Sequence, residues 1–179
     1  YGTGFHSNDA RGVSTIIDPN TGERIDTVDP LVRTQGAEFG IRSSAIPHLT
    51  STLTFFWLQS DSEVVYVGDE GKNEAGPGSE RYGVEWANYW RPTDWFSMDA
   101  EIALTHGRFT DAGKDKYIPN SVPVMFSGGV NFGAQGDAEG FFANVRARAF
   151  GKRPLIEDNS VTGKSSFLVN AGVGYRKKN

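Results

Sequence analysis

Hydrophobic and polar residues alternate with a period of two along most of this chain, and clusters of Gly, Pro, Asn, Asp and Ser bound the alternating segments. Successive side chains of a β-strand point to opposite faces, so this period predicts strands and not helices. In segment 95–108, Phe96 and Ile102 fall on one face, whereas Asp99 and Glu101 fall on the other. The same pattern predicts strands at 35–43, 49–67, 81–91, 122–132, 140–150 and 165–176.

These strands are roughly ten residues long, which exceeds the usual five or six of soluble sheets and matches a tilted membrane span. The connections alternate in length, as the outer loops and periplasmic turns of bacterial outer-membrane barrels do. We therefore predict an all-β fold: an antiparallel up-and-down meander of about seven to eight long strands, forming a segment of a large transmembrane β-barrel. Long outer loops are expected near 13–32, 69–79, 109–120 and 152–164, and short periplasmic turns near 45–48, 92–94 and 134–139.

Composition narrows the classes of function. The chain has 179 residues, which is one domain's length at most, and it lacks Cys, which excludes disulfide frameworks and thiolate chemistry. It has 18 Lys and Arg residues and 22 Asp and Glu residues, so it carries no excess of positive charge that would favour nucleic-acid binding. No run approaches the roughly 18 apolar residues of a membrane helix. Aromatic residues near strand ends, such as Trp90 and Trp95, suit a membrane interface.

Two short motifs suggest ligand sites and are set aside. Segment 163–165 reads Gly-Lys-Ser, as at the end of a phosphate-binding loop, but Asp158 stands where that loop requires Gly, so we predict a turn. Carboxylates near the sequence GDEG fit no calcium-loop spacing, and a solvated outer loop is the better interpretation. These carboxylates are Asp69, Glu70, Glu74 and Glu80.

The residues that could be candidates for catalysis are better explained as parts of the strands and loops. Asp99 and Glu101 share a strand face at about 7 Å, within the range of paired-carboxylate hydrolases, but an alternating strand supplies neither a closed pocket nor a raised pKa. His6 precedes Ser7 and lies near Asp9, and neighbours in one loop rarely form a catalytic triad. We predict that the chain is not an enzyme and has no cofactor and no metal site.

Five strings of residues extend together over nearly the whole chain: GFHSNDARG (4–12), DPLVRTQGAEFGIR (29–42), FFWLQSDSEVVYVGDEG (55–71), ERYGVEWANYWRPTDW (80–95) and ARAFGKRPLIEDNS (147–160). In their order and spacing these strings resemble the C-terminal part of the β-barrel of TonB-dependent outer-membrane receptors. Members of this family build a barrel of about 22 strands around a plug. The resemblance implies that the plug domain, the TonB-contacting box, the early strands and the closing strands lie outside this sequence.

The resemblance implies a part of an active-transport receptor in the cell outer membrane, which imports a scarce ligand such as a metal chelate or siderophore with TonB-relayed energy. The implied partners are outer-membrane lipid, the plug domain, the remaining barrel strands, the TonB system and the imported small ligand. Ligand-binding residues are expected on outer loops: Asp69, Glu70, Lys72, Arg108, Lys114, Arg153 and Asp158. Lumen-facing residues are expected to be Glu38, Arg42, Arg81, Glu85, Asp99, Glu101, Asn144, Arg146 and Arg148.

Two alternatives fit the same alternation, because sequence alone does not say which face of a strand points inward. The first is a soluble β-barrel or sandwich that binds a small apolar ligand and buries the apolar face. The second is a self-contained small outer-membrane barrel, since eight strands can close into one.

Overall fold

The computed structural model of the protein describes residues 1–8, 13–14, 16–17, 21–24, 29–62, 64–67, 72–110, 113, 116–133 and 139–177. At 64–67 and 72–75 it describes the backbone alone. No helix of this described part is long and apolar enough to cross a membrane.

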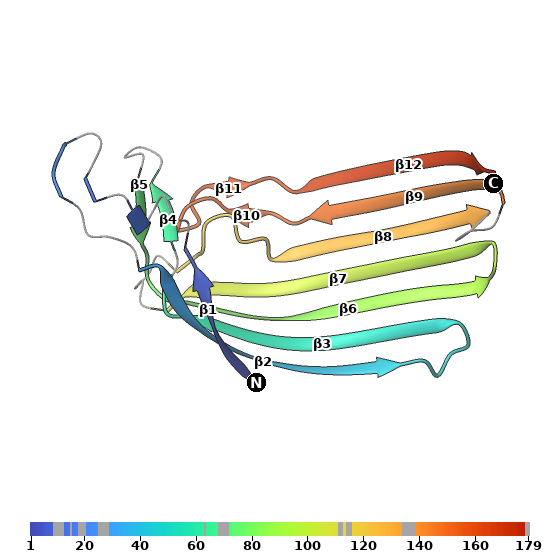
Figure 1. The fold of residues 1–179 in the computed structure, drawn as a ribbon, viewed down its shortest axis with the longest axis horizontal. Helices are drawn as coiled ribbons and strands as arrows, with labels where there is room; N and C mark the ends of the chain where they lie inside the picture. Colours follow the sequence, from blue (N-terminus) through green and yellow to red (C-terminus); the bar gives the residue numbers. More distant parts are fainter. Residues whose placement is uncertain are drawn as a thin grey trace.

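Eight antiparallel strands form one sheet in the order β1-β2-β3-β6-β7-β8-β9-β12 (Figure 1). Each long strand pairs with the next long strand along the chain, so the sheet is an up-and-down meander. This confirms the predicted all-β class and meander. The strands are β1 (Gly2–Ser7), β2 (Leu31–Ser43), β3 (Leu49–Ser60), β6 (Ser79–Thr93), β7 (Phe96–Phe109), β8 (Val124–Gly133), β9 (Gly140–Phe150) and β12 (Ser166–Arg176).

Four short strands form two further hairpins, which alternation along the chain did not predict. β4 (Val64–Val67) pairs with β5 (Lys72–Ala75), and β10 (Arg153–Pro154) pairs with β11 (Thr162–Gly163). The segment expected as one strand over 49–67 is therefore two strands, because pairing with β6 ends at Ser60. β1 was also missed, since six residues with two Gly carry little alternation.

The connections divide between the two ends of the sheet. β4, β5, β10 and β11 lie at one end, together with the long connections, and short turns lie at the other end (Figure 1). The turn before β3 is closed by a hydrogen bond from the Leu49 amide to the Ile46 carbonyl, 3.1 Å long. His48, with φ of 65°, occupies the left-handed conformation of this turn. Which end faces the outside of a cell stays a prediction.

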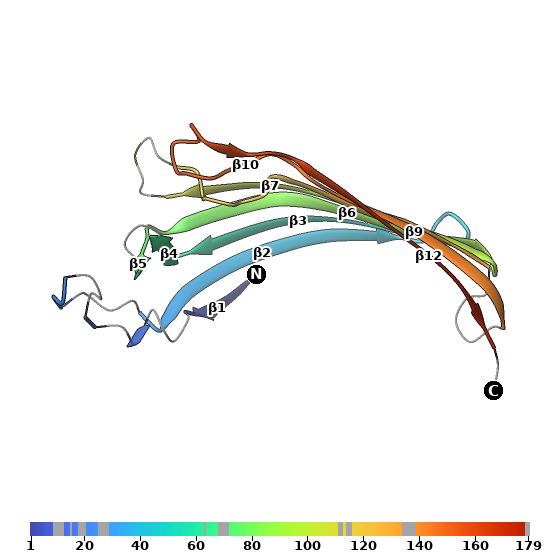
Figure 2. The same ribbon diagram turned by 90° about the horizontal axis from the view of Figure 1, so that it is seen from above.

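The sheet is strongly curved and open. Figure 2 shows it bent along its length, and β1 and β12 each pair on one side only within the described residues. Eight strands are present, yet this part does not close into the small barrel considered above. Sheets of this length curl because strand twist accumulates.

Few hydrophobic side chains are buried. In the described part these are Val32, Ala103, Phe109 and Ile118. By contrast, Trp86 is 50% exposed and Val173 is 81% exposed. The soluble alternative requires the apolar face to be enclosed, and the structure does not enclose it.

Residues 116–123 fold back onto the sheet near the long connections. The Phe109 amide donates to the Lys116 carbonyl at 2.9 Å, and the Thr105 amide donates to the Pro123 carbonyl at 2.8 Å. A Cβ on Gly107 would lie 3.3 Å from the Ile118 side chain, so Ile118 packs directly over this glycine. The segment is thereby joined to β7 at both of its ends.

Candidate functional site: the two faces of the sheet

The strand register places all nine residues expected to face a lumen on one face of the sheet. Glu85 lies opposite Ala103, Glu101 lies opposite Ser127, and Ser127 lies opposite Arg148. We call this surface the polar face. It carries Glu38, Arg42, Arg81, Glu85, Asp99, Glu101, Asn144, Arg146 and Arg148. Whether the polar face lines an aqueous interior stays a prediction.

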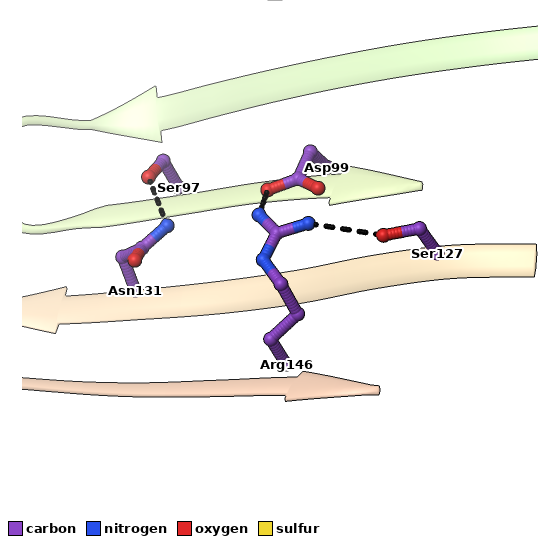
Figure 3. Close-up of polar contacts among 5 residues, drawn as sticks. All are labelled: Ser97, Asp99, Ser127, Asn131 and Arg146. Atoms are coloured by element: carbon purple, nitrogen blue, oxygen red, sulfur yellow. Dashed lines mark hydrogen bonds and ion pairs between the residues drawn. The ribbon is translucent and has the colours of Figure 1, made fainter. Parts of the chain in front are cut away.

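An ion pair crosses one whole strand on this face. An Arg146 Nη2 on β9 donates to Asp99 Oδ1 on β7 at 2.7 Å, over the intervening β8 (Figure 3). Gly129 lies between the two residues in the register. A Cβ on Gly129 would lie 3.0 Å from Arg146 Nη2, so the guanidinium rests on the space that this glycine leaves open. The short distance is typical of a charge-assisted hydrogen bond.

Hydroxyl and amide groups extend the contacts around this ion pair. The Arg146 Nη1 donates to Ser127 Oγ at 3.3 Å, and the Asn131 amide donates to Ser97 Oγ at 3.3 Å (Figure 3). Ser97 is almost completely buried. The face thus holds a network across β7, β8 and β9 whose charged centre is partly screened from water.

A recess lies beside this network. Its polar lining includes Glu85, Glu101, Ser127 and Arg148, and its volume is about 320 Å³. Neither Glu85 nor Glu101 has a hydrogen-bond or ion-pair partner among the described residues. The unpaired charges therefore face solvent.

The expected ligand-binding residues of the loops are partly described. The Arg108 guanidinium lies 3.5 Å from the centre of the Tyr117 ring, a cation–π contact, and Arg153 belongs to the β10–β11 hairpin. Asp69, Glu70 and Lys114 lie outside the described residues, and only the backbone of Lys72 is described, in β5. The segment that carries Tyr117 connects the described residues, because the Tyr117 amide donates to the Glu157 carbonyl at 3.0 Å and the Asn120 amide donates to the Pro154 carbonyl at 2.8 Å. Their role in ligand binding stays a prediction.

Asp158 caps a turn. Its Oδ1 accepts the Ser160 amide at 2.8 Å. Hydrogen bonds from the Ser160 backbone and then from its side chain lower the pKa of Asp158, because they stabilise the carboxylate form. The short motif at 163–165 follows this turn: Gly163 ends β11, and Ser165 directly precedes β12.

No group of three potential metal ligands occurs among the described residues. His6 lies on the edge strand β1, His48 lies in a turn, and the His106 ring stacks on Tyr82 with centroids 5.0 Å apart. Each of the three histidines thus has a separate structural setting.

The opposite face, here called the apolar face, has a sharp polar limit that alternation did not predict. Gln35, Gln59, Glu80 and Arg108 lie opposite one another across four strands and form one polar row. The next row holds aromatic rings, and Trp57 Nε1 donates to Glu80 Oε1 at 2.6 Å. Tyr82 and His106 continue that row. Rings with one polar edge at the limit of an apolar band are typical of a membrane interface.

The apolar band runs obliquely across the strands. On β3 it extends from Trp57 to Leu49, and on β12 it extends from Phe167 to Tyr175. The register aligns Phe167 with Leu53, so both limits shift by about four residues, or about 13 Å, between β3 and β12. Five strand spacings separate these strands, about 24 Å. A horizontal band therefore requires tilted strands, as in a transmembrane barrel.

No family model matches the sequence, and no curated protein is significantly similar to it. The fold has clear counterparts among solved structures. The ferric preacinetobactin receptor BauA from Acinetobacter baumannii matches with a TM-score of 0.68 and 16% identity, over 99% of this chain and 26% of BauA. The copper transporter OprC matches with a TM-score of 0.70 and 13% identity, over 98% of this chain and 28% of OprC.

The ferric yersiniabactin uptake receptor FyuA from Yersinia pestis matches with a TM-score of 0.65 and 14% identity, over 82% of this chain and 23% of FyuA. This chain thus spans about a quarter of the length of each of these proteins. All three are TonB-dependent outer-membrane receptors, so the expected resemblance is confirmed at the level of the fold. The chain has the fold of a segment of their barrel.

Proposed function

We propose that the chain forms part of the barrel wall of an outer-membrane receptor that imports a scarce ligand, a metal chelate or siderophore, with TonB-relayed energy. The observation that carries the proposal is the agreement between an open, curved, two-faced sheet and the barrels of metal-uptake receptors. The names of two of these receptors specify ferric chelates as their ligands.

Each face has a separate task in this proposal. The apolar face contacts outer-membrane lipid, because moving the exposed Trp86 and Val173 side chains out of water lowers the free energy. The polar face lines the interior and contacts the plug domain, which lies outside this chain together with the remaining barrel strands and the contact with TonB. No step of this role makes or breaks a covalent bond, so the chain is proposed not to be an enzyme.

The outer loops contribute to ligand binding. Arg108 and Arg153 supply cationic groups, and Asp158 supplies an anionic one, at the end of the sheet where the long connections gather. Asp69, Glu70, Lys72 and Lys114 complete the proposed set. Ferric chelates with net negative charge would be attracted by the arginines.

An uptake experiment tests the proposal in the full-length protein that contains this chain. Cells that lack the gene are compared with complemented cells during iron limitation, with ⁵⁵Fe complexes of catecholate, hydroxamate and phenolate chelators as probes. We expect uptake of one class of chelate to depend on the gene and to stop when an ionophore collapses the proton gradient. Unchanged uptake of all three classes after deletion would count against a ferric-chelate receptor.

A further inference from the structure

A groove crosses the apolar face close to the short turns, and its volume is about 540 Å³. Asn88 and Ala100 pair with each other in the register and form its floor, and Ser51 continues this row on β3. Trp86 and Trp90 belong to the pairing rows on either side of the floor. The groove therefore lies between two rows of large side chains.

Both ends of the groove are bounded. On β8 the floor row continues to Gly128, where a Cβ would lie 2.9 Å from Phe126 Cζ, so the Phe126 ring covers this glycine. At the other end, Ile46 of the turn and Leu49 at the start of β3 line the groove. The groove is thus a short, separate depression within the apolar face.

The width of the groove limits what can occupy it. Trp86 and Trp90 are four residues apart on β6, about 13 Å between Cα atoms, and their indole rings take up part of this distance. An α-helix with its side chains is about 10–12 Å wide and does not fit into the remaining space. A single hydrocarbon chain does fit, and the apolar walls favour it.

The floor also carries a polar group that calls for a partner. The Asn88 side chain has no hydrogen-bond partner among the described residues. Its neighbour Ser51 already accepts a hydrogen bond from Trp86 Nε1, at 2.9 Å. An unpaired amide that faces hydrocarbon raises the free energy, so the occupant of the groove should supply a hydrogen-bonding group.

The depth of Asn88 indicates which group this is. Contacts among the Trp90, Trp95, Phe96 and Phe132 rings, with centroids 5.1–6.1 Å apart, mark the limit of the apolar band beside the short turns. Such rings lie at the level of lipid headgroups. Asn88 is two residues beyond Trp90, about 7 Å along β6. One headgroup layer is about 5–7 Å thick, so Asn88 lies where acyl chains begin, at the level of their ester groups.

We propose that the groove is a binding site for one glycerophospholipid of the leaflet on the side of the short turns. One acyl chain lies over Ala100 between Trp86 and Trp90, and its ester carbonyl accepts a hydrogen bond from the Asn88 amide. The site rests on the proposed function, because it requires the apolar face to lie in a membrane. It differs from general lipid contact in holding one molecule by a defined polar contact.

Native mass spectrometry of the full-length protein in detergent tests the site, because it counts the lipids that stay bound. The probes are dioleoyl phosphatidylethanolamine and its analogue with ether-linked chains, which lacks the ester carbonyl oxygens. We expect one ester-linked lipid to stay bound. The ether-linked lipid should bind about fivefold more weakly, the effect of losing one ordinary hydrogen bond.

Substitutions identify the groups responsible. Asn88→Leu keeps the size of the side chain and removes the amide, so it should weaken binding of the ester-linked lipid about fivefold and abolish the preference for it. Ala100→Phe fills the groove and should abolish retention of the lipid. Ala171→Phe is the matched control, because Ala171 lies on the same face, opposite Val145 and outside the groove. Heat-modifiable mobility on gels checks that each variant folds.

Three results would overturn the lipid site: no phospholipid retained by the parent protein, an unchanged preference for the ester-linked lipid in Asn88→Leu, or undiminished retention in Ala100→Phe. The mass of two protein copies that separate in Ala100→Phe would also overturn it, since the groove would then be a protein interface. Retention of the lipid without ⁵⁵Fe uptake would contradict the proposed ligand class and leave the site in place. Uptake without retention would remove the site alone.

Discussion

Gly129 decides where the Arg146 guanidinium lies. The side chain of Arg146 reaches Asp99 only by passing over this residue, where any Cβ would lie 3.0 Å from Nη2. A glycine in the middle of a strand is otherwise unfavourable, because it orders a flexible backbone and adds no packing. Its presence here follows from the close approach of another side chain.

The substitution Gly129→Ala should therefore uncouple Asp99 from Arg146. A double-mutant cycle with Asp99→Asn and Arg146→Gln, followed by urea unfolding in detergent, measures this coupling. We expect about 0.5–1 kcal/mol in the parent chain, since the pair is partly exposed, and a value near zero in the Gly129→Ala background. Gly4→Ala is the control, because its Cβ would meet Thr34 Oγ1 at an ordinary 3.6 Å. Equal coupling in all three backgrounds would contradict this role of Gly129.

The Asp158 turn should respond to acid. Its carboxylate has a pKa below the ordinary value near 3.8 in the folded chain, so the cap contributes above that ordinary value and is lost as the pH falls through the lowered one. Hydrogen exchange of the Ser160 amide, corrected for intrinsic rates, should show protection that declines in acid. Asp158→Asn keeps an acceptor oxygen that does not titrate and should give constant protection. A decline in both proteins would show that the cap is not its cause.

At the scale of elements, the sequence predicted the bounds of a strand well where polar and apolar residues alternate clearly. β9 spans Gly140–Phe150, as expected, because polar and apolar residues alternate strictly along its central part, from Ala143 to Ala149. β3 ends at Ser60, short of the expected limit, and the phase of the pattern is already lost beyond Gln59. The break depends on where β6 begins, and this lies in another part of the chain.

Alternation along the sequence could not predict which side chains contact each other across strands. Alternation assigned Asp99 and Arg146 to polar positions, but their pairing depends on two successive registers, of β7 with β8 and of β8 with β9. These residues are 47 positions apart. The polar row that contains Gln59 and Glu80 was missed for the same reason, since each of these residues interrupts an apolar face only when its strands are aligned.

Strand β7 allows the two faces to be compared at adjacent residues. Under the membrane hypothesis, Ala100→Arg places a charge on the apolar face and should destabilise the folded protein by about 2–4 kcal/mol near the bilayer centre. Glu101→Gln, on the polar face, should change stability by less than about 0.5 kcal/mol. Folding of the full-length protein into lipid vesicles, followed by heat-modifiable mobility on gels, measures both. Equal tolerance would contradict the assignment of the faces.

At the scale of the whole molecule, the described part of the chain exposes two surfaces that soluble proteins normally cover. One is the apolar face, where Phe39 is 65% exposed, and the other comprises the free edges of β1 and β12. Unpaired edges are templates for further strands. In a larger barrel within a bilayer, lipid would cover the apolar face and neighbouring strands would pair with the edges.

The chain on its own should therefore depend on detergent. Diluted below the critical micelle concentration, it should associate, and light scattering should rise with chain concentration. In micelles it should keep its β-sheet circular dichroism spectrum. A monomeric, folded chain in plain buffer, as judged by analytical ultracentrifugation, would contradict the proposed membrane location of the apolar face.

The slanted apolar band has a geometric consequence for closure. Its limits climb by nearly one residue per strand, so a ring built from such strands returns to its starting strand with an accumulated stagger. Stagger and circumference together determine how far the strands lean and how wide the pore becomes. The local alignment of a few neighbouring strands thus already constrains the diameter of a complete cylinder.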